Sequence, residues 1–184
     1  MRSLESILNG SHGRITELEA LVNAQRRHVF ISHHFADDRA VDALTALMKR
    51  GGVDVRNSSI RLKDANKQRL EKGEVSDLAL RRALRMKISW AQTTVVLIGK
   101  ETHDREWVNY EIEEAHRQGK AIIGVYEQGN QDAKIPEALD SFATTIVAWN
   151  TDAILSAVEG TLDAFQAADG SERSPSNQIQ NRTC

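Results

Sequence analysis

The sequence predicts an α/β fold, a three-layer sandwich in which helices cover both faces of a five-stranded parallel sheet. Two observations predict it. Short apolar runs of strand-forming residues alternate along the chain with segments whose apolar residues recur at helical spacing. In addition, the run 93–98 lacks the polar alternation of a half-exposed strand, which is typical of a parallel strand covered on both sides.

The strands and helices are delimited by turn-forming and capping residues. We expect strands at residues 27–32, 53–55, 93–98, 121–126 and 144–149. We expect five helices. The first ends at about Arg50, the second covers 75–89, and the third runs from the N-cap Asp104 to Gly119. The fourth has Pro136 in its first turn, and the fifth runs from Thr151 or Asp152 to about Ala167. In the third helix, Val108, Ile112 and Ala115 should face the sheet.

The chain divides into three parts. Residues 1–26 form an N-terminal helical extension, in which an amphipathic helix is expected over about 13–25. Residues 27–167 form one domain, and residues 168–184, which contain almost no apolar residue, are predicted to be a disordered tail. We expect the extension either to pack on the domain or to mediate self-association.

The composition excludes several classes of protein. The chain of 184 residues has a net charge of −2, without the basic excess of a nucleic-acid or anionic-membrane binder, so we expect neither partner. Its one cysteine, Cys184, excludes an intrachain disulfide framework. No apolar run approaches the length of a membrane span, and the N-terminus is not that of a signal peptide. A cytoplasmic protein is therefore expected.

A ligand site is predicted beside the first and third strands. With five strands, the flavodoxin-like order 2-1-3-4-5 is our first choice, and its switch point lies between those two strands. Ligands of such sheets bind in the crevice at the carboxyl ends of the strands there. We therefore expect a crevice between residues 32–35, which end the first strand, and the helix that carries Trp107 and Glu111.

Three common chemistries of this topology are disfavoured. The first turn, residues 33–38, contains no glycine, which argues against a phosphate-cradling loop. It also lacks the Ser, Thr, Gly and Asn of a flavin-binding loop. A phospho-receiver would carry its acceptor aspartate at the end of the third strand, where this chain has Gly99, Lys100 and Glu101.

Three segments remain distinctive when they are taken together. Residues 29–37 carry a strand followed by Ser-x-His, residues 95–102 carry Leu-Ile-Gly-x-x-Thr, and residues 107–112 carry Trp-x-x-x-Glu. These segments resemble the TIR-like family, and within it the branch that includes the TIR subunit of bacterial Thoeris anti-phage defence systems. The resemblance covers about residues 27–150.

The resemblance implies cleavage of NAD+ at its nicotinamide–ribose bond, with Glu111 as the catalytic residue. Ordinary glycosidases need a second carboxylate to protonate a poor leaving group. Nicotinamide leaves NAD+ as a neutral molecule, so one carboxylate, ionised at neutral pH like an ordinary glutamate, can stabilise the oxocarbenium-like transition state. From the helix alone, a solvated glutamate near a helix N-terminus is the simpler interpretation of Glu111.

The resemblance also indicates substrate-binding residues: Ser32, His34, Phe35, Ser58 and Trp107. The serines and His34 could contact ribose or phosphate, Phe35 could stack on a ring of the substrate, and Trp107 could wall the pocket. Each has a structural alternative: a turn hydroxyl, a surface imidazole, a loop anchor or a packed core ring. Relatives often have Asp and Ser early in the loop where this chain has Asn57, Ser58 and Ser59.

We expect no metal or other cofactor, since NAD+ is the substrate. The ADP-ribose product, cyclised or joined to another small molecule, is implied to be a signal that activates a separate effector protein, and self-association is expected. Two alternatives remain. One is a non-enzymatic interaction module that uses the TIR surface and the N-terminal helix for assembly, and the other is a sensor that binds NAD+ without consuming it.

Overall fold

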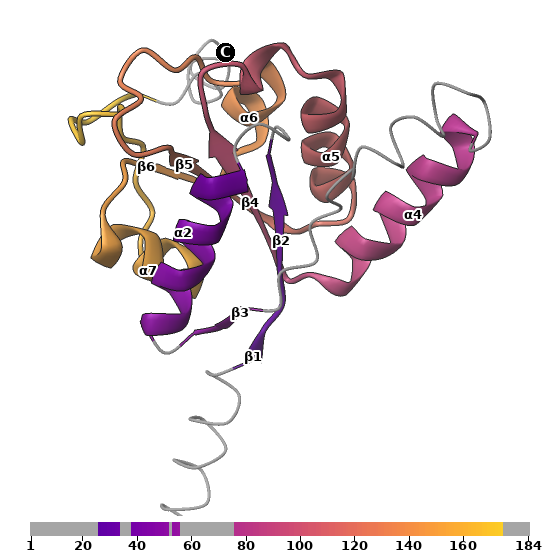
Figure 1. Cartoon of the computed structure of the whole chain (residues 1–184), viewed down its shortest axis with the longest axis horizontal. Helices are drawn as coiled ribbons and strands as arrows, with labels where there is room; N and C mark the ends of the chain where they lie inside the picture. The colour runs from indigo at the N-terminus through magenta and orange to yellow at the C-terminus, as the bar shows by residue number, and fades with distance from the viewer. Residues whose placement is uncertain (1–25, 34–37, 52, 56–75, 175–184) are drawn as a thin grey trace, which may run out of the picture.

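The computed structural model describes residues 26–33, 38–51, 53–55 and 76–174 (Figure 1). The strands are β1 (Arg26–Arg27), β2 (Val29–Ser32), β3 (Asp54–Val55), β4 (Thr93–Ile98), β5 (Ala121–Tyr126) and β6 (Thr145–Val147). The helices are α2 (Asp38–Arg50), α4 (Asp77–Trp90), α5 (Glu106–Arg117), α6 (Glu137–Phe142) and α7 (Thr151–Glu159), with a one-turn 3-10 helix at Thr102–Asp104.

A parallel sheet with the strand order β2-β4-β5-β6 forms the centre of the molecule (Figure 1). In its register, Ser32 lies beside Val96, and Val96 lies beside Gly124. Because all four strands run in one direction, their carboxyl ends share one edge of the sheet. Ser32, the last residue of β2, therefore lies at the edge where the sequence predicts a ligand site.

The predicted single five-stranded sheet in the order 2-1-3-4-5 is not found in the described part of the chain. Instead, β3 pairs in parallel with β1 in a separate two-stranded ladder, with Arg26 beside Asp54. The first predicted strand is interrupted at His28, whose carbonyl accepts hydrogen bonds from the N–H groups of Gln92 at 2.9 Å and Thr93 at 3.4 Å. The α/β class and the parallel direction are as predicted.

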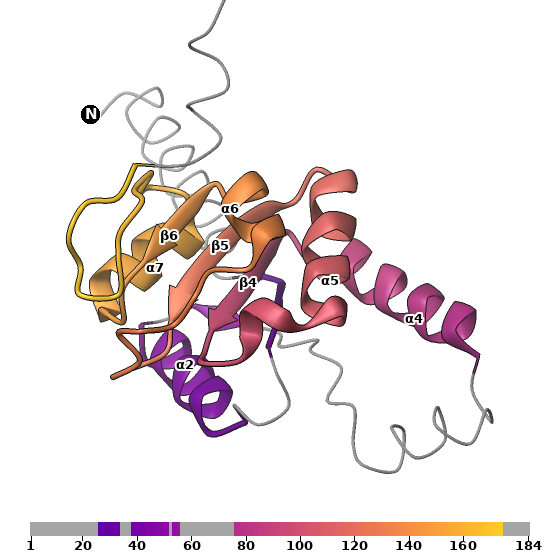
Figure 2. The ribbon, with the colours of Figure 1, turned by 90° about the horizontal axis from the view of Figure 1, so that it is seen from above.

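Helices cover both faces of the sheet, as Figure 2 shows from above. On one face, α2 and α7 pack around a buried cluster that includes Ile31, Val95 and Val125. On the other face, α4, α5 and α6 pack around a cluster that includes Phe30 and Val96. Every residue of β4, Thr93 and Thr94 included, is buried, as expected of a parallel strand that is covered on both faces.

The segment between β4 and α5 is built by a turn rather than by the predicted cap. The N-cap of α5 is Arg105, and Asp104 lies in the preceding 3-10 helix, so the prediction of Asp104 as N-cap is wrong. Thr102 closes the turn, because its hydroxyl accepts a hydrogen bond from the N–H of Gly99 at 2.9 Å. The stripe of Val108 and Ile112 is buried against the sheet, as predicted.

The last helix is shorter than predicted. It ends at Glu159 rather than near Ala167, because Gly160 adopts a left-handed conformation, with φ of +74°, that stops a helix. The chain then runs beside β6. The N–H of Ile146 donates to the carbonyl of Ala164 at 2.9 Å, and the N–H of Gln166 donates to the carbonyl of Ile146 at 2.8 Å.

The prediction of a disordered tail from residue 168 fails for residues 168–174, which the structure describes. The N–H of Ala167 donates to the carbonyl of Ser171 at 2.8 Å, and Arg173 forms an ion pair with Asp140 of α6. These contacts tie residues 168–174 to the domain, so the prediction is wrong for them. Residues 175–184 and the predicted extension up to residue 25 lie outside the described residues.

Candidate active site

The structure brings together Ser32 and Glu111, which lie 79 positions apart in the sequence. The hydroxyl of Ser32 donates a hydrogen bond of 2.5 Å to Oε2 of Glu111. Both side chains are buried, with 1% of Ser32 and 9% of Glu111 exposed. The contact joins the carboxyl end of β2 to α5, which packs over that face of the sheet.

The surroundings of Glu111 favour its protonated form. Burial raises the pKa of Glu111 from 4.5 to about 8, and the hydrogen bond from Ser32 partly opposes that rise. The expectation of an ordinary, ionised glutamate therefore fails for the free protein. At pH 7, one unit below this pKa, about one molecule in ten carries the charge. A cation that binds beside Glu111 would lower its pKa and favour the ionised form.

A second buried carboxylate on α5, Glu114, has a different environment. It is 4% exposed and forms an ion pair of 2.5 Å with Arg117 and one of 3.5 Å with Arg85. Gln118 also donates a hydrogen bond to it at 2.6 Å. These donors, Arg117 first, lower the pKa of Glu114. Glu114 is thus an ionised structural carboxylate, whereas no ion pair of Glu111 is found among the described residues.

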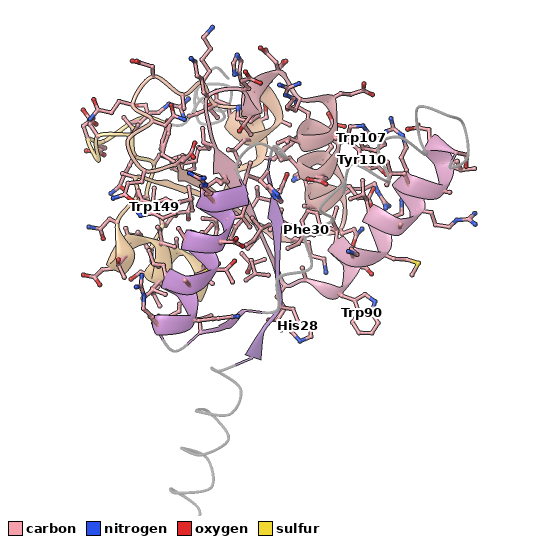
Figure 3. The ribbon with its side chains drawn as sticks, viewed as in Figure 1. His28, Phe30, Trp90, Trp107, Tyr110 and Trp149 are labelled. Atoms are coloured by element: carbon pink, nitrogen blue, oxygen red, sulfur yellow. The ribbon has the colours of Figure 1, made fainter. Side chains whose placement is uncertain are left out.

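Trp107 faces α4. In Figure 3 its ring lies beside that of Tyr110, and the two pack edge-on with 5.9 Å between the ring centres. The guanidinium of Arg81 lies 5.1 Å from the centre of the Trp107 ring. The Trp107 side chain is partly buried against the cluster on this face of the sheet, and its aromatic and cation contacts are with Tyr110 and Arg81 rather than with Ser32. The remaining candidates, His34, Phe35 and Ser58, lie outside the described residues.

Sequence reasoning missed two contributors to this region, Arg81 and Tyr110. The only signal for Tyr110 was its spacing of three residues from Trp107, which puts the two rings on one side of a helix. Arg81 is one of several basic residues of α4, and nothing in the sequence distinguishes it.

Two features typical of other classes of protein are absent from the described residues. There, no cluster of three or more His, Cys, Asp or Glu side chains is arranged to hold a metal ion. No helix among them has both the length and the apolar character needed to cross a membrane.

Known proteins resemble this chain over the region that contains Ser32 and Glu111. The family model described as "Thoeris protein ThsB, TIR-like domain" matches residues 30–132. A protein of Bacillus cereus (strain MSX-D12), named "Putative cyclic ADP-D-ribose synthase ThsB1", is 31% identical over 121 residues. The aligned region is 62% of this chain and 62% of that protein, so the chain spans less than two thirds of this curated relative.

Two solved structures are also similar, at lower levels. The TIR domains of the activated Roq1 resistosome are 17% identical, cover 55% of this chain and 57% of that chain, and give a TM-score of 0.38. The CMP N-glycosidase BcmB of Clostridium botulinum is 14% identical, covers 74% of this chain and 100% of that chain, and gives a TM-score of 0.45. The matched family segment contains both Ser32 and Glu111, and the chain belongs to the Thoeris ThsB family with its TIR-like domain.

Proposed function

We propose that this protein is a TIR-type enzyme that cleaves the nicotinamide–ribose bond of NAD+, with Glu111 as its catalytic residue. One observation carries the proposal. A buried carboxylate, held by Ser32 and without an ion pair among the described residues, lies at the carboxyl edge of a parallel sheet. That edge is where open α/β sheets bind their ligands. Membership of the ThsB family and the name of the Bacillus relative support the same activity.

The charge that develops in this reaction suits such a carboxylate. When the bond between the ribose C1′ and the nicotinamide nitrogen breaks, its electron pair returns to the nitrogen and nicotinamide leaves neutral. The positive charge moves to the ribose, which becomes oxocarbenium-like. An ionised Glu111 stabilises this cation, and the low dielectric of a buried site strengthens the attraction.

Substrate binding would also prepare Glu111 for this role. The pyridinium ring of NAD+ is cationic, and an opposite charge nearby lowers the pKa of a carboxyl group. Glu111 would therefore release its proton to solvent as the substrate binds. Ser32 donates to Oε2, which leaves Oε1 to accept a hydrogen bond from a ribose hydroxyl.

The fate of the ribosyl cation decides the product. Attack by water, which loses a proton, yields ADP-ribose, and attack by a nitrogen of adenine or of another small molecule yields a cyclic or conjugated nucleotide. We propose that the product is an ADP-ribose-derived signal that activates a separate effector in cytoplasmic anti-phage defence. Mass spectrometry of the products made from NAD+ identifies which acceptor is used.

The proposal is tested by measuring nicotinamide release from NAD+ by HPLC. We expect Glu111→Gln to abolish release while its circular dichroism stays that of the parent protein. Glu113→Gln is the matched control, because Glu113 is an exposed glutamate of the same helix, and it should release nicotinamide at the parent rate. Equal release by Glu111→Gln and the parent would refute the assignment.

A second candidate, a non-enzymatic assembly module, is favoured by one observation. Three large apolar side chains of α4 are exposed: Leu78 is 69%, Met86 61% and Trp90 73% accessible. Apolar side chains gathered on one exposed helix are typical of protein–protein interfaces, here between copies of this chain. Phage protection that survives Glu111→Gln in cells would favour this candidate over the enzyme.

A further inference from the structure

We propose that Arg81 of α4 is a positioning residue that sets the rotation of α5 about its axis and so aims Glu111 at the substrate. The inference rests on the proposed function of Glu111. It starts from the guanidinium of Arg81 on α4, which lies against the rings of Trp107 and Tyr110 in the turn of α5 that precedes Glu111.

The contacts of Arg81 fix its side chain at both ends. On its own helix, Nε donates to Asp77 at 2.8 Å, one turn earlier. Across the gap to α5, Nη2 lies 3.4 Å from Glu106, and the guanidinium carbon lies 5.1 Å from the ring centre of Trp107 and 4.5 Å from that of Tyr110. A planar guanidinium stacks on aromatic faces while its N–H groups bind carboxylates, so one side chain holds three residues of α5.

Helical geometry relates these contacts to Glu111. At 3.6 residues per turn, Glu106, Trp107 and Tyr110 share the side of α5 that faces α4, and Val108 shares the side that faces the sheet. Glu111 lies between the two sides. Packing on the sheet restrains α5 on one side of Glu111, and the contact with Arg81 restrains it on the other, so together they set the position of Glu111.

Small rotations would matter at this distance from the helix axis. For a side-chain atom ~6 Å from the axis, a rotation of about 20° moves the atom by roughly 2 Å. Catalytic groups must lie within roughly 0.5 Å of their productive position. Loss of the Arg81 contact would therefore misplace Glu111 without unfolding the helix.

Other contacts of α5 do not replace this one. A second arginine of α4, Arg85, lies 3.5 Å from Glu114, which follows Glu111, and so holds the later turns of the helix. Tyr110 has a buried hydroxyl without a hydrogen-bond partner among the described residues, so its described polar contact is the guanidinium over its ring. Leu80 and Leu84 of α4 share a buried cluster with Val108 of α5, and Arg81 adds to this apolar packing a polar contact with the turn before Glu111.

Steady-state kinetics of three variants test the positioning role. Arg81→Gln should lower kcat by about 10- to 100-fold, the effect of a misplaced catalytic group, with KM within about twofold of the parent value. Arg81→Lys keeps the charge but loses the planar face, so its kcat should lie between that of the parent and that of Arg81→Gln. Arg82→Gln, at the exposed neighbouring arginine, should match the parent. A higher KM with unchanged kcat in Arg81→Gln would overturn the proposal. So would a decrease in kcat in Arg82→Gln as large as that in Arg81→Gln.

A second measurement does not depend on catalysis. NMR titration of the carboxyl carbon of Glu111, assigned with Glu111→Gln, reports the surroundings of the carboxyl directly. In folded Arg81→Gln, water reaches the carboxyl and its pKa should fall from about 8 towards 4.5, whereas Arg82→Gln should leave it unchanged. An unchanged Glu111 pKa in folded Arg81→Gln overturns the positioning role. A shifted pKa in a protein that releases no nicotinamide supports the Arg81–Glu111 coupling and removes only the proposed function.

Discussion

The burial of Glu111 lowers the stability of the fold as well as tuning the carboxyl. Its pKa is about 8 in the folded state and near 4.5 when the chain is unfolded. Between these values the folded state binds more protons than the unfolded state, so the free energy of unfolding falls as pH rises. At about 1.4 kcal/mol per pKa unit, the penalty above pH 8 is on the order of 5 kcal/mol.

Removal of this charge should therefore stabilise the protein in a pH-dependent way. Urea denaturation should show Glu111→Gln close to the parent at pH 5, where the parent carboxyl is protonated. At pH 8.5 it should be more stable by up to about 5 kcal/mol, less any cost of unpaired amide hydrogens. The exposed control Glu113→Gln should follow the parent at both pH values. Equal stability of Glu111→Gln and the parent at pH 8.5 would contradict the burial argument.

At the residue scale, the sequence indicated which side chains meet but not their state. Ser32 and Glu111 could be matched because one ends an apolar strand and the other belongs to a recognisable helix motif. The ionisation of Glu111 could not be predicted, because it depends on burial that arises only when α5 packs on the sheet. Trp107 lies against Arg81 of another helix, a contact that the pattern within its own helix does not reveal.

At the element scale, the turn that enters α5 gives a structural role to the threonine of the Leu-Ile-Gly-x-x-Thr pattern. Thr102 is fully buried, and its hydroxyl is the acceptor for the N–H of Gly99. The turn leads the chain from β4 into α5, so its geometry sets where the helix begins. In the sequence Thr102 is part of a motif, and in the structure its hydroxyl closes the turn between β4 and α5.

Replacement of this hydroxyl should cost stability. Thr102→Val keeps the shape of the side chain but leaves the N–H of Gly99 without its acceptor, which should cost about 1–3 kcal/mol in urea denaturation. Thr102→Ser, which keeps the hydroxyl, should lose less. A Thr102→Val variant as stable as the parent would show that the turn does not depend on this hydrogen bond.

The ends of the buried strands were predicted correctly, whereas the end of α7 was not. The bounds of β4 and β5 match the predicted ranges 93–98 and 121–126, because these strands are buried along almost their whole length. The end of α7 was missed because Leu162 and Phe165 continue an apolar pattern beyond Gly160. In the structure these two side chains pack against opposite faces of the sheet, which one helix could not achieve.

At the scale of the whole molecule, the fold class followed from the alternation of strands and helices, but the exact sheet did not. The second predicted strand does pair with the start of the first, Val55 beside Arg27, but the break at His28 leaves β1 and β3 as a two-stranded ladder apart from the main sheet. The chain after α7 also joins the sheet, since Phe165 bridges to Ile146 of β6. Such pairings depend on tertiary contacts that no local pattern encodes.

The pH dependence of the activity should reflect the ionisation of the buried Glu111 carboxyl. The pH dependence of kcat/KM reports the ionisation of groups in the free enzyme. If catalysis needs ionised Glu111, kcat/KM for nicotinamide release should rise about tenfold per pH unit and level off near pH 8. Ser32 lowers the pKa of Glu111 through its hydrogen bond, so Ser32→Ala should move the rise to higher pH.

This pH profile, measured for the parent and for Ser32→Ala, tests the central claim most directly, because it links turnover to the contact between Ser32 and Glu111. We predict a rise that ends near pH 8 in the parent and at higher pH in the variant. A parent profile that levels off near pH 4.5, or two profiles that coincide, would contradict the account.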